Sequence, residues 1–319
     1  MANNTNLSSA NELSSTMQVY YDRKMMMDMK PKLVHYQYGQ RRPLPLNHGK
    51  QVSFRKWTPF GALTTPLTEG ATPDGQSLAL SEVTTSISQF GGFVAVSDLL
   101  DMTALDAVVN DSVELMADQG ALTVDTLTRG AMLAGVNVLY AANNGVVAGG
   151  RSSVTANHKL TSTELRKAVR LLKRNKAPTF MRAGKGYYVA IVSPESVFDL
   201  QSDPLWQDVS KYQDSEQIYS GEIGRLFGVI VVETPEAHVY AGAGASGADV
   251  AVTFVFGKDA YGVVDLGNNN VRAIIKNRGS AGTSDPLDQV STIGWKVDGY
   301  GAKILQHAWI VRVEHGFSA

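Results

Sequence analysis

The chain has 319 residues, a net charge of −1 at pH 7 and no cysteine. The near-zero charge argues against a dedicated DNA-binding protein, and the absence of thiols excludes disulfides, thiolate zinc sites and cysteine nucleophiles. No apolar run reaches the roughly 18–20 residues that cross a bilayer. The first residues, "MANNTNLSSANELSSTMQ", have neither the basic nor the apolar region of a secretory signal, so we expect none.

The first fifty residues predict a helix followed by an extended arm. Met17, Tyr20 and Met25 recur at helical spacing within residues 12–29, and Pro31 ends this pattern. The next stretch, "HYQYGQRRPLPLNHGK", contains prolines and glycines without periodicity. We expect it to lie extended against another surface.

Residues 51–97 predict a long, polar β-hairpin. The segment "QVSFRKW" is typical of a strand, a Pro-, Gly- and Thr-rich stretch follows, and "SLALSEVTTSISQFGGFVAVSD" predicts a second extended stretch. A polar hairpin buries too little apolar surface to be stable alone. It is either an edge hairpin on a local sheet or an arm that neighbouring subunits hold.

A long helix is expected from Asp106 to about Leu133, with an apolar stripe through Val109, Val113 and Met116. About 28 residues would span roughly 42 Å, which indicates a structural spine. The glycine-rich segment "NNGVVAGGRSSVTANHK" then marks the boundary of a second unit.

The second unit predicts helices on a small mixed sheet, an α+β fold class. Here "GYYVAIVSP" and "VAVTFVFG" are typical of buried strands, whereas "GEIGRLFGVIVVET" predicts a helix, a turn and a strand. The tail strands in "VRAIIKNRG" and "STIGWKVDGYGAKILQHAWIVRVEHG" have no helix of their own. We expect them to pack on the spine helix.

The most conspicuous charge pattern is a basic helix that begins near Thr161 or Ser162. Leu165, Ala168 and Leu172 lie at the spacing of one apolar face. The opposite face carries Arg166, Lys167, Arg170, Lys173 and Arg174. This basic face is the candidate site. It is left either to solvent, as on an ordinary helix, or to an acidic surface of another subunit, or to nucleic acid inside an assembly.

The distribution of charge along the chain supports a contact between unlike surfaces. Residues 61–150 hold ten acidic residues and one basic residue, whereas residues 151–186 hold ten basic residues and one acidic residue. Such blocks arise by chance in some folds. Alternatively, blocks of opposite sign meet within one subunit or between copies.

Motifs of catalysis and cofactor binding do not support an enzyme. The string "GAGASG" matches the dinucleotide fingerprint, but the following "ADVAVTFVFG" predicts a strand where the fingerprint needs a helix. The six histidines are scattered singly, and the sequence has neither a Walker loop nor a G-x-S-x-G elbow. We expect no catalytic residue, no cofactor and no metal.

Several strings in order resemble the major capsid proteins of tailed bacteriophages. They include "YYDRKMMMDMKPKLVHYQYGQRRPLPLNHGKQVSFRKW", "TPLTEGATPDGQSLALSEVTTSISQFGGFVAVSDLLD", "GYYVAIVSPESVFDLQSDPLW" and "GSAGTSDPLDQVSTIGWKV". The resemblance covers nearly the whole chain. It implies the phage coat fold, with an N-terminal arm (1–50), an extended loop (51–97), a peripheral domain (98–140 and 268–319) and an axial domain (141–267).

The resemblance also implies a function and partners. Subunits of this family form hexamers and pentamers that close into an icosahedral head around double-stranded DNA, so we expect self-assembly, a place in the virion shell after assembly in the host bacterial cytoplasm, a portal, and weak non-specific contact with the DNA. Only about fifty residues precede the first strand, so a scaffolding protein, if used, is expected to be separate. No membrane partner is expected.

Two other functions remain open from the sequence. An encapsulin-like nanocompartment shell would have the same fold and enclose enzyme cargo. A DNA-binding protein could act through residues 164–176, although tight phosphate binding would hinder a shell that must fill with DNA and release it.

Overall fold

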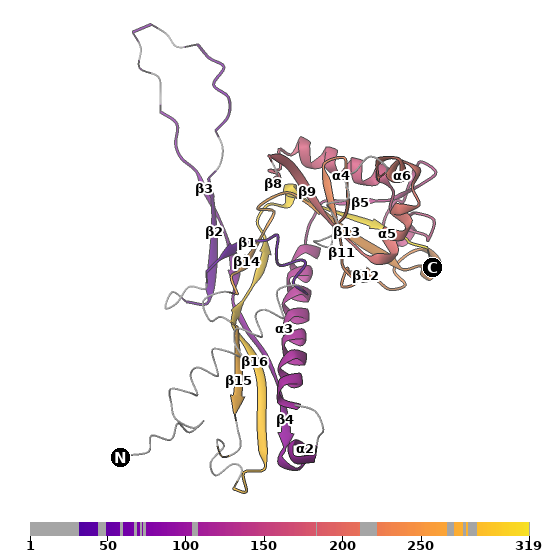
Figure 1. Ribbon diagram of the computed structural model, residues 1–319. Coiled ribbons are helices and arrows are strands. Elements are labelled where there is room, and N and C mark those ends of the chain that lie inside the picture. The colour runs from indigo at the N-terminus through magenta and orange to yellow at the C-terminus, as the bar shows by residue number, and fades with distance from the viewer. Residues whose placement is uncertain are drawn as a thin grey trace.

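The computed structural model describes residues 32–43, 49–57, 60–66, 69–70, 72, 75–103, 108–182, 184–210, 222–266, 271–276, 279 and 286–318. The helix expected over residues 12–29 and the expected start of the spine helix at Asp106 lie outside these ranges. Within them, the chain forms a tall unit around a long helix, a second unit around a large sheet, and a projecting hairpin (Figure 1).

The tall unit is built on α3 (Val108–Leu133), a helix of 26 residues that ends where the sequence predicts. At 1.5 Å per residue it is about 39 Å long. Beside it lies a three-stranded antiparallel sheet of order β15-β16-β4, with β4 (Ser88–Ser97), β15 (Val271–Lys276) and β16 (Val290–Tyr300). The short helix α2 (Asp98–Thr103) follows β4 directly (Figure 1).

The second unit is built on an eight-stranded mixed sheet of order β10-β11-β9-β13-β18-β5, with β12 beside β13 and β8 beside β9. Its strands are β5 (Val138–Tyr140), β8 (Phe180–Arg182), β9 (Lys185–Val192), β10 (Glu222–Leu226), β11 (Val229–Glu233), β12 (Val239–Tyr240), β13 (Val250–Phe256) and β18 (Ile310–His315). Its helices are α4 (Ser162–Arg174), α5 (Pro194–Gln201) and α6 (Pro204–Ser210).

Smaller pairings complete the fold. The hairpin strands β2 (Gln51–Trp57) and β3 (Leu80–Ser86) pair with each other, as do β6 (Ala142–Asn143) and β7 (Val146–Val147). A third sheet has the order β1-β14-β17, with β1 (Gln40–Arg42), β14 (Tyr261–Val264) and β17 (Ala302–Ile304). Single 3₁₀ turns cover Arg151–Ser153, Ala245–Gly247 and His307–Trp309.

The eight-stranded sheet is buried on both faces. Along β9, Val189 and Ile191 enter the core shared with α3, whereas Tyr188, Ala190 and Val192 enter a second core on the opposite face. This division follows from the two-residue period of a strand. Because the first core also contains side chains of β4, β15 and β16, it joins the two units.

The structure differs from the sequence expectations at three strands. The segment around Glu222–Leu226 is a strand rather than a helix, because it pairs with β11 through a tight turn in which Phe227 and Gly228 have positive φ. Strand β4 leaves the extended loop to pair with β16. Strand β18 lies in the eight-stranded sheet between β13 and β5, not on the spine helix. The division into four domains otherwise stays a prediction.

The arm is fixed to α3 by a buried carboxylate. Asp125 accepts hydrogen bonds from the backbone N–H of His35 at 2.7 Å and of Tyr36 at 3.3 Å, and its second oxygen lies 2.6 Å from His35 Nδ1. Both His35 and Asp125 are buried. The Tyr261 hydroxyl donates to the His35 carbonyl, so β14 is tied to the same point.

The hairpin leaves the body next to this anchor. Phe54 of β2 packs directly on Gly262 of β14, where an added Cβ would meet the phenyl ring at 2.4 Å. Lys56 Nζ lies 4.3 Å from the centroid of the Trp309 ring, and Lys303 Nζ donates to the Thr84 carbonyl at 3.0 Å. These contacts hold the base of the hairpin, while the rest projects away from the body (Figure 1).

We predict that Asp125→Ala lowers the free energy of unfolding of the unassembled chain by about 3–5 kcal/mol, because it leaves His35 and two backbone N–H groups buried without an acceptor. The matched control is Asp118→Ala on the same helix, which removes a half-exposed ion pair with Lys32 and should cost at most about 1 kcal/mol. Chemical denaturation measures both. Equal costs would contradict the anchoring role of Asp125.

A second prediction concerns acid stability. Burial lowers the pKa of His315 to about 4, and its Nε2 lies 2.9 Å from the Thr253 hydroxyl. Because the unfolded chain binds a proton near pH 6.5 and the folded chain does not, stability contributed by neutral His315 is present above pH 6.5 and lost as pH falls towards 4. The loss should be about 3 kcal/mol. Between pH 7 and pH 4.5, the free energy of unfolding should fall less in His315→Gln than in the wild-type chain, as measured by chemical denaturation at both pH values. An equal fall in the two chains would refute this role of His315.

Candidate assembly surfaces

The predicted basic helix is α4, and its apolar stripe lies on the eight-stranded sheet as expected. Leu165, Ala168 and Leu172 are completely buried in the second core. Their partners include Val255 of β13 and Val311 of β18. The helix is therefore fixed in orientation, and the opposite face is directed away from the sheet.

The start of α4 is capped by a residue distant in sequence. Thr161 occupies the N-cap position, but its side chain makes no capping hydrogen bond. Instead, the carboxylate of Asp203 accepts a hydrogen bond from Ser162 N–H at 2.8 Å. Burial acts to raise the pKa of Asp203, but hydrogen bonds from Ser162 and Leu205 outweigh it and hold the pKa below its ordinary value.

The five residues of the predicted basic face all lie on α4, and one of them, Lys167, is engaged in an ion pair within the helix. Lys167 Nζ lies 2.8 Å from the buried carboxylate of Glu164. The Arg166 guanidinium lies 5.0 Å from the centroid of the Phe227 ring, a cation–π contact. Arg170, Lys173 and Arg174 are exposed. We call the exposed residues Arg166, Arg170, Lys173 and Arg174 the α4 basic face.

The hairpin presents apolar side chains to solvent. Leu63 is 81% exposed and Leu78 is 70% exposed. Among the described residues of the hairpin, Trp57, Phe60 and Leu80 are exposed as well. Since monomeric proteins rarely expose such a group of side chains on one projecting element, this surface indicates a contact with another molecule.

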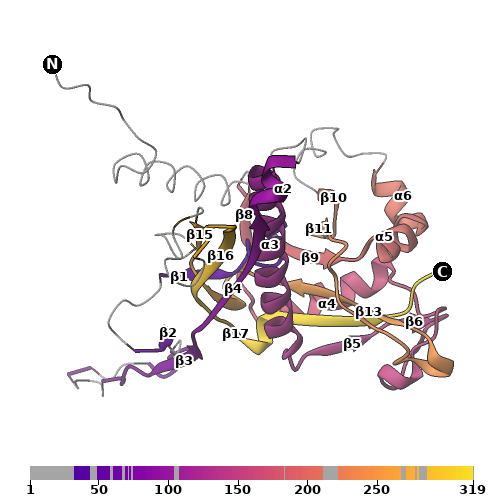
Figure 2. The ribbon, with the colours of Figure 1, turned by 90° about the horizontal axis from the view of Figure 1, so that it is seen from below.

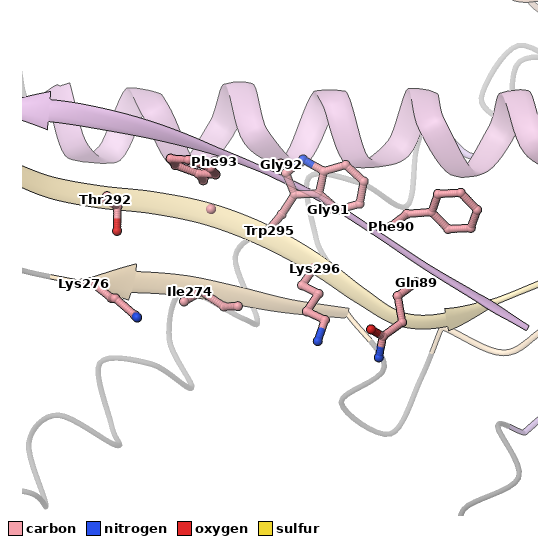
Figure 3. Close-up of a pocket in the computed structure, with 11 residues that line it drawn as sticks. Gln89, Phe90, Gly91, Gly92, Phe93, Ile274, Lys276, Thr292, Trp295 and Lys296 are labelled. Atoms are coloured by element: carbon pink, nitrogen blue, oxygen red, sulfur yellow. The ribbon is translucent and has the colours of Figure 1, made fainter. Parts of the chain in front are cut away.

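A groove crosses the three-stranded sheet, with a volume of about 430 Å³ (Figure 3). Phe93 of β4 is 74% exposed at this groove, and Ile274 of β15 lies near it. Gly91 and Gly294 line it without side chains, so the backbone forms part of the floor. Lys276 and Lys296 add positive charge beside this apolar floor. We call it the sheet groove.

Sequence reasoning found the basic face but missed the sheet groove and the Asp203 cap. The groove is formed by strands more than 170 residues apart in sequence, which no local pattern connects. The run "FGG" in β4 was the available signal, because glycines in a strand mark places where a backbone is approached closely.

The described residues show no constellation of catalytic or metal-binding groups. Among them, no group of three or more histidine and carboxylate side chains could hold a metal ion. The "GAGASG" string lies between β12 and β13, so a strand follows it and not a helix. No helix in the described ranges is long and apolar enough to cross a membrane.

Comparisons with known proteins agree on one family and one fold. Residues 124–304 match the sequence model of a family described as "Phage capsid protein". A comparison with curated protein sequences gives no match.

Three solved capsid structures are similar to the chain. They are the capsid of Ralstonia phage GP4 (14% identity, TM-score 0.73, 88% of each chain covered), the capsid of cyanophage Pam1 (15%, 0.68, 92% of each) and the capsid of cyanophage P-SCSP1u (16%, 0.64, 90% of this chain and 89% of that one). At these identities the likeness shows a shared fold.

We predict that Asp203→Ala lowers the free energy of unfolding by about 1–2 kcal/mol, because Ser162 N–H loses its acceptor at the start of α4. Thr161→Ala is the matched control, and it should change stability by less than about 0.5 kcal/mol, since its side chain makes no cap. Thermal denaturation of the two variants makes the comparison. A larger effect at Thr161 than at Asp203 would disprove the assignment of the cap.

Proposed function

The chain belongs to the phage capsid protein family, and we propose that it is the major coat protein that assembles into hexamers and pentamers, which close into an icosahedral head around double-stranded DNA. Family membership places it in the capsid shell of the virion as a structural protein, not an enzyme. The fold it shares with capsid assemblies implies association with further copies of itself. The family match favours a phage head over the nanocompartment alternative.

The observation that carries this proposal is the projecting hairpin. Within the described ranges its strands β2 and β3 pair only with each other, and beyond its buried base the side chains of Trp57, Phe60, Leu63, Leu78 and Leu80 are exposed. A two-stranded hairpin of this kind is at best marginally stable in water by itself. Contact with a neighbouring copy would remove its apolar side chains from solvent.

The sheet groove is a suitable place for such a contact. The hairpin segment 58–80 exposes the apolar side chains of Phe60, Leu63 and Leu78 and carries two charges, both negative, at Glu69 and Asp74. The groove combines exposed Phe93 with the cations Lys276 and Lys296. In the proposed assembly, the hairpin of one copy covers the groove of the next and thereby matches both its apolar character and its charge.

The proposal includes three further partners: a separate scaffolding protein, a portal, and packaged DNA. The contact with DNA is weak and non-specific in this proposal. A net charge of −1 supports weak contact, because strong binding to phosphates needs a large excess of positive charge.

The proposed assembly is tested by electron microscopy of the purified chain, expressed alone and together with phage head proteins. We expect icosahedral particles. A chain that stays monomeric or dimeric under both conditions would rule out the proposed function.

Point variants test the contact itself. Leu63→Asp on the hairpin and Phe93→Asp at the groove should each reduce the yield of particles at least about tenfold, because each places a charge in an interface that must exclude water. Both side chains are exposed, so the thermal stability of the unassembled chain should not change. Met181→Asp, at a side chain that is 72% exposed on β8, is the matched control and should assemble normally.

A further inference from the structure

The α4 basic face is a concentration of like charge that its own subunit leaves exposed. Arg166, Arg170 and Arg174 follow one another at i, i+4 spacing, an arrangement in which like charges destabilise a helix. Within the described ranges, no ion pair is found for Arg170, Lys173 or Arg174. An anionic surface supplied from outside the subunit would relieve this repulsion.

An acidic cavity lies elsewhere in the molecule, at the inner corner between α3 and the end of β11. Its volume is about 380 Å³. Four of its lining residues are acidic, namely Asp118, Asp125, Glu233 and Glu236. Leu122, nearly half-exposed on α3, provides an apolar wall. We call this cavity the acidic notch.

Contacts within the subunit occupy the carboxylates of the acidic notch only in part. Asp125 is engaged with His35, and Asp118 pairs with Lys32. Glu236 lies 3.7 Å from Arg129. Glu233 is exposed, and no ion pair is found for it among the described residues. The notch therefore keeps a negative charge that faces solvent.

The α4 basic face and the acidic notch lie on opposite sides of the eight-stranded sheet. α4 covers the face that carries Tyr188 and Ala190, whereas α3 packs against the core of the other face, which contains Ile230 and Val232. In Figure 1 α4 lies along the upper side of this sheet, whereas α3 runs downward from the lower side. Figure 2 views the molecule from below, so that α3 runs towards the viewer. Neither surface can reach the other within one subunit.

We propose that the α4 basic face of one copy docks on the acidic notch of the next copy. Two complementary surfaces on opposite sides of one subunit produce a head-to-tail contact, and such a contact generates a ring when the rotation between copies closes. This inference rests on the proposed function and names the charged contact within its hexamers and pentamers. Double-stranded DNA is the competing occupant, but it leaves the charge of the notch without a role.

The test exchanges the charges of the two surfaces in the full-length chain. Arg170→Glu, Lys173→Glu and Arg174→Glu together change the formal charge of the α4 basic face from +4 to −2, and Glu233→Lys with Glu236→Lys replaces the two exposed carboxylates of the notch with cations. Each of these two variants should reduce particle yield at least about tenfold at low salt, because like charges then face each other across the contact. The chain that carries all five substitutions should recover assembly, since every contact again joins unlike charges.

A mixture of the variant with the reversed basic face and the variant with the reversed notch gives a sharper readout. A contact between identical variants repels, whereas a contact between different variants attracts in both directions. The copies must therefore alternate, which allows rings of six but not rings of five. We expect open sheets or tubes in electron micrographs instead of closed shells, which need five-fold vertices.

Matched controls and contrary outcomes separate this inference from the proposed function. Lys185→Glu with Lys258→Glu makes the net charge more negative by four at exposed positions outside both surfaces, and this variant should assemble normally. If the wild-type chain assembles but the variant with all five substitutions does not, the docking contact is wrong and the proposed function stands. If the reversed basic face assembles fully but packages less DNA, the face is directed to the DNA. A wild-type chain that never assembles overturns both.

Discussion

The carboxylate of Asp125 is the point on which the arrangement of the chain depends. A buried charge is tolerated only when its hydrogen-bonding capacity is filled, and here the arm fills it with two backbone N–H groups and the ring of His35. A segment without regular periodicity is thereby fixed across the middle of α3. The first core closes over that segment, and β14 and the base of the hairpin are positioned by the same contacts.

The two units differ in how completely their sheets are covered by other elements of the same chain. The eight-stranded sheet is covered on one face by α4 and α5 and on the other by the core shared with α3, so its central strands are buried throughout. The three-stranded sheet has α3 on one side, and its other side carries the groove with exposed Phe93. The hairpin is covered only at its base, where Val52 and Phe54 are buried. The outer part of the hairpin and the outer side of the three-stranded sheet thus leave large apolar side chains in contact with solvent.

Local patterns predicted the elements whose environment is encoded within one segment. Three such features could be predicted from the sequence: the apolar stripe of α4, the end of α3 and the continuous apolar run of β13. Each depends on a pattern that extends over only a few turns or residues. Strand β10 was mistaken for a helix, since its strand character comes from pairing with β11. The sheet assignments of β4 and β18 depend on partners far along the chain, which no local window contains. The basic face was predicted, whereas its cap at Asp203 and the opposing notch required tertiary structure.

The length of α3 has a geometric consequence for any shell built from this chain. A continuous helix of 26 residues resists bending, so it acts as a rigid support along the tall unit and keeps the two ends of that unit at a constant separation. Regular structure is interrupted at Ile87 between β3 and β4 and in the short connection after Leu133. In the proposed shell, a change in the shape of the subunit would therefore bend the chain at these two places and leave the length of α3 unchanged.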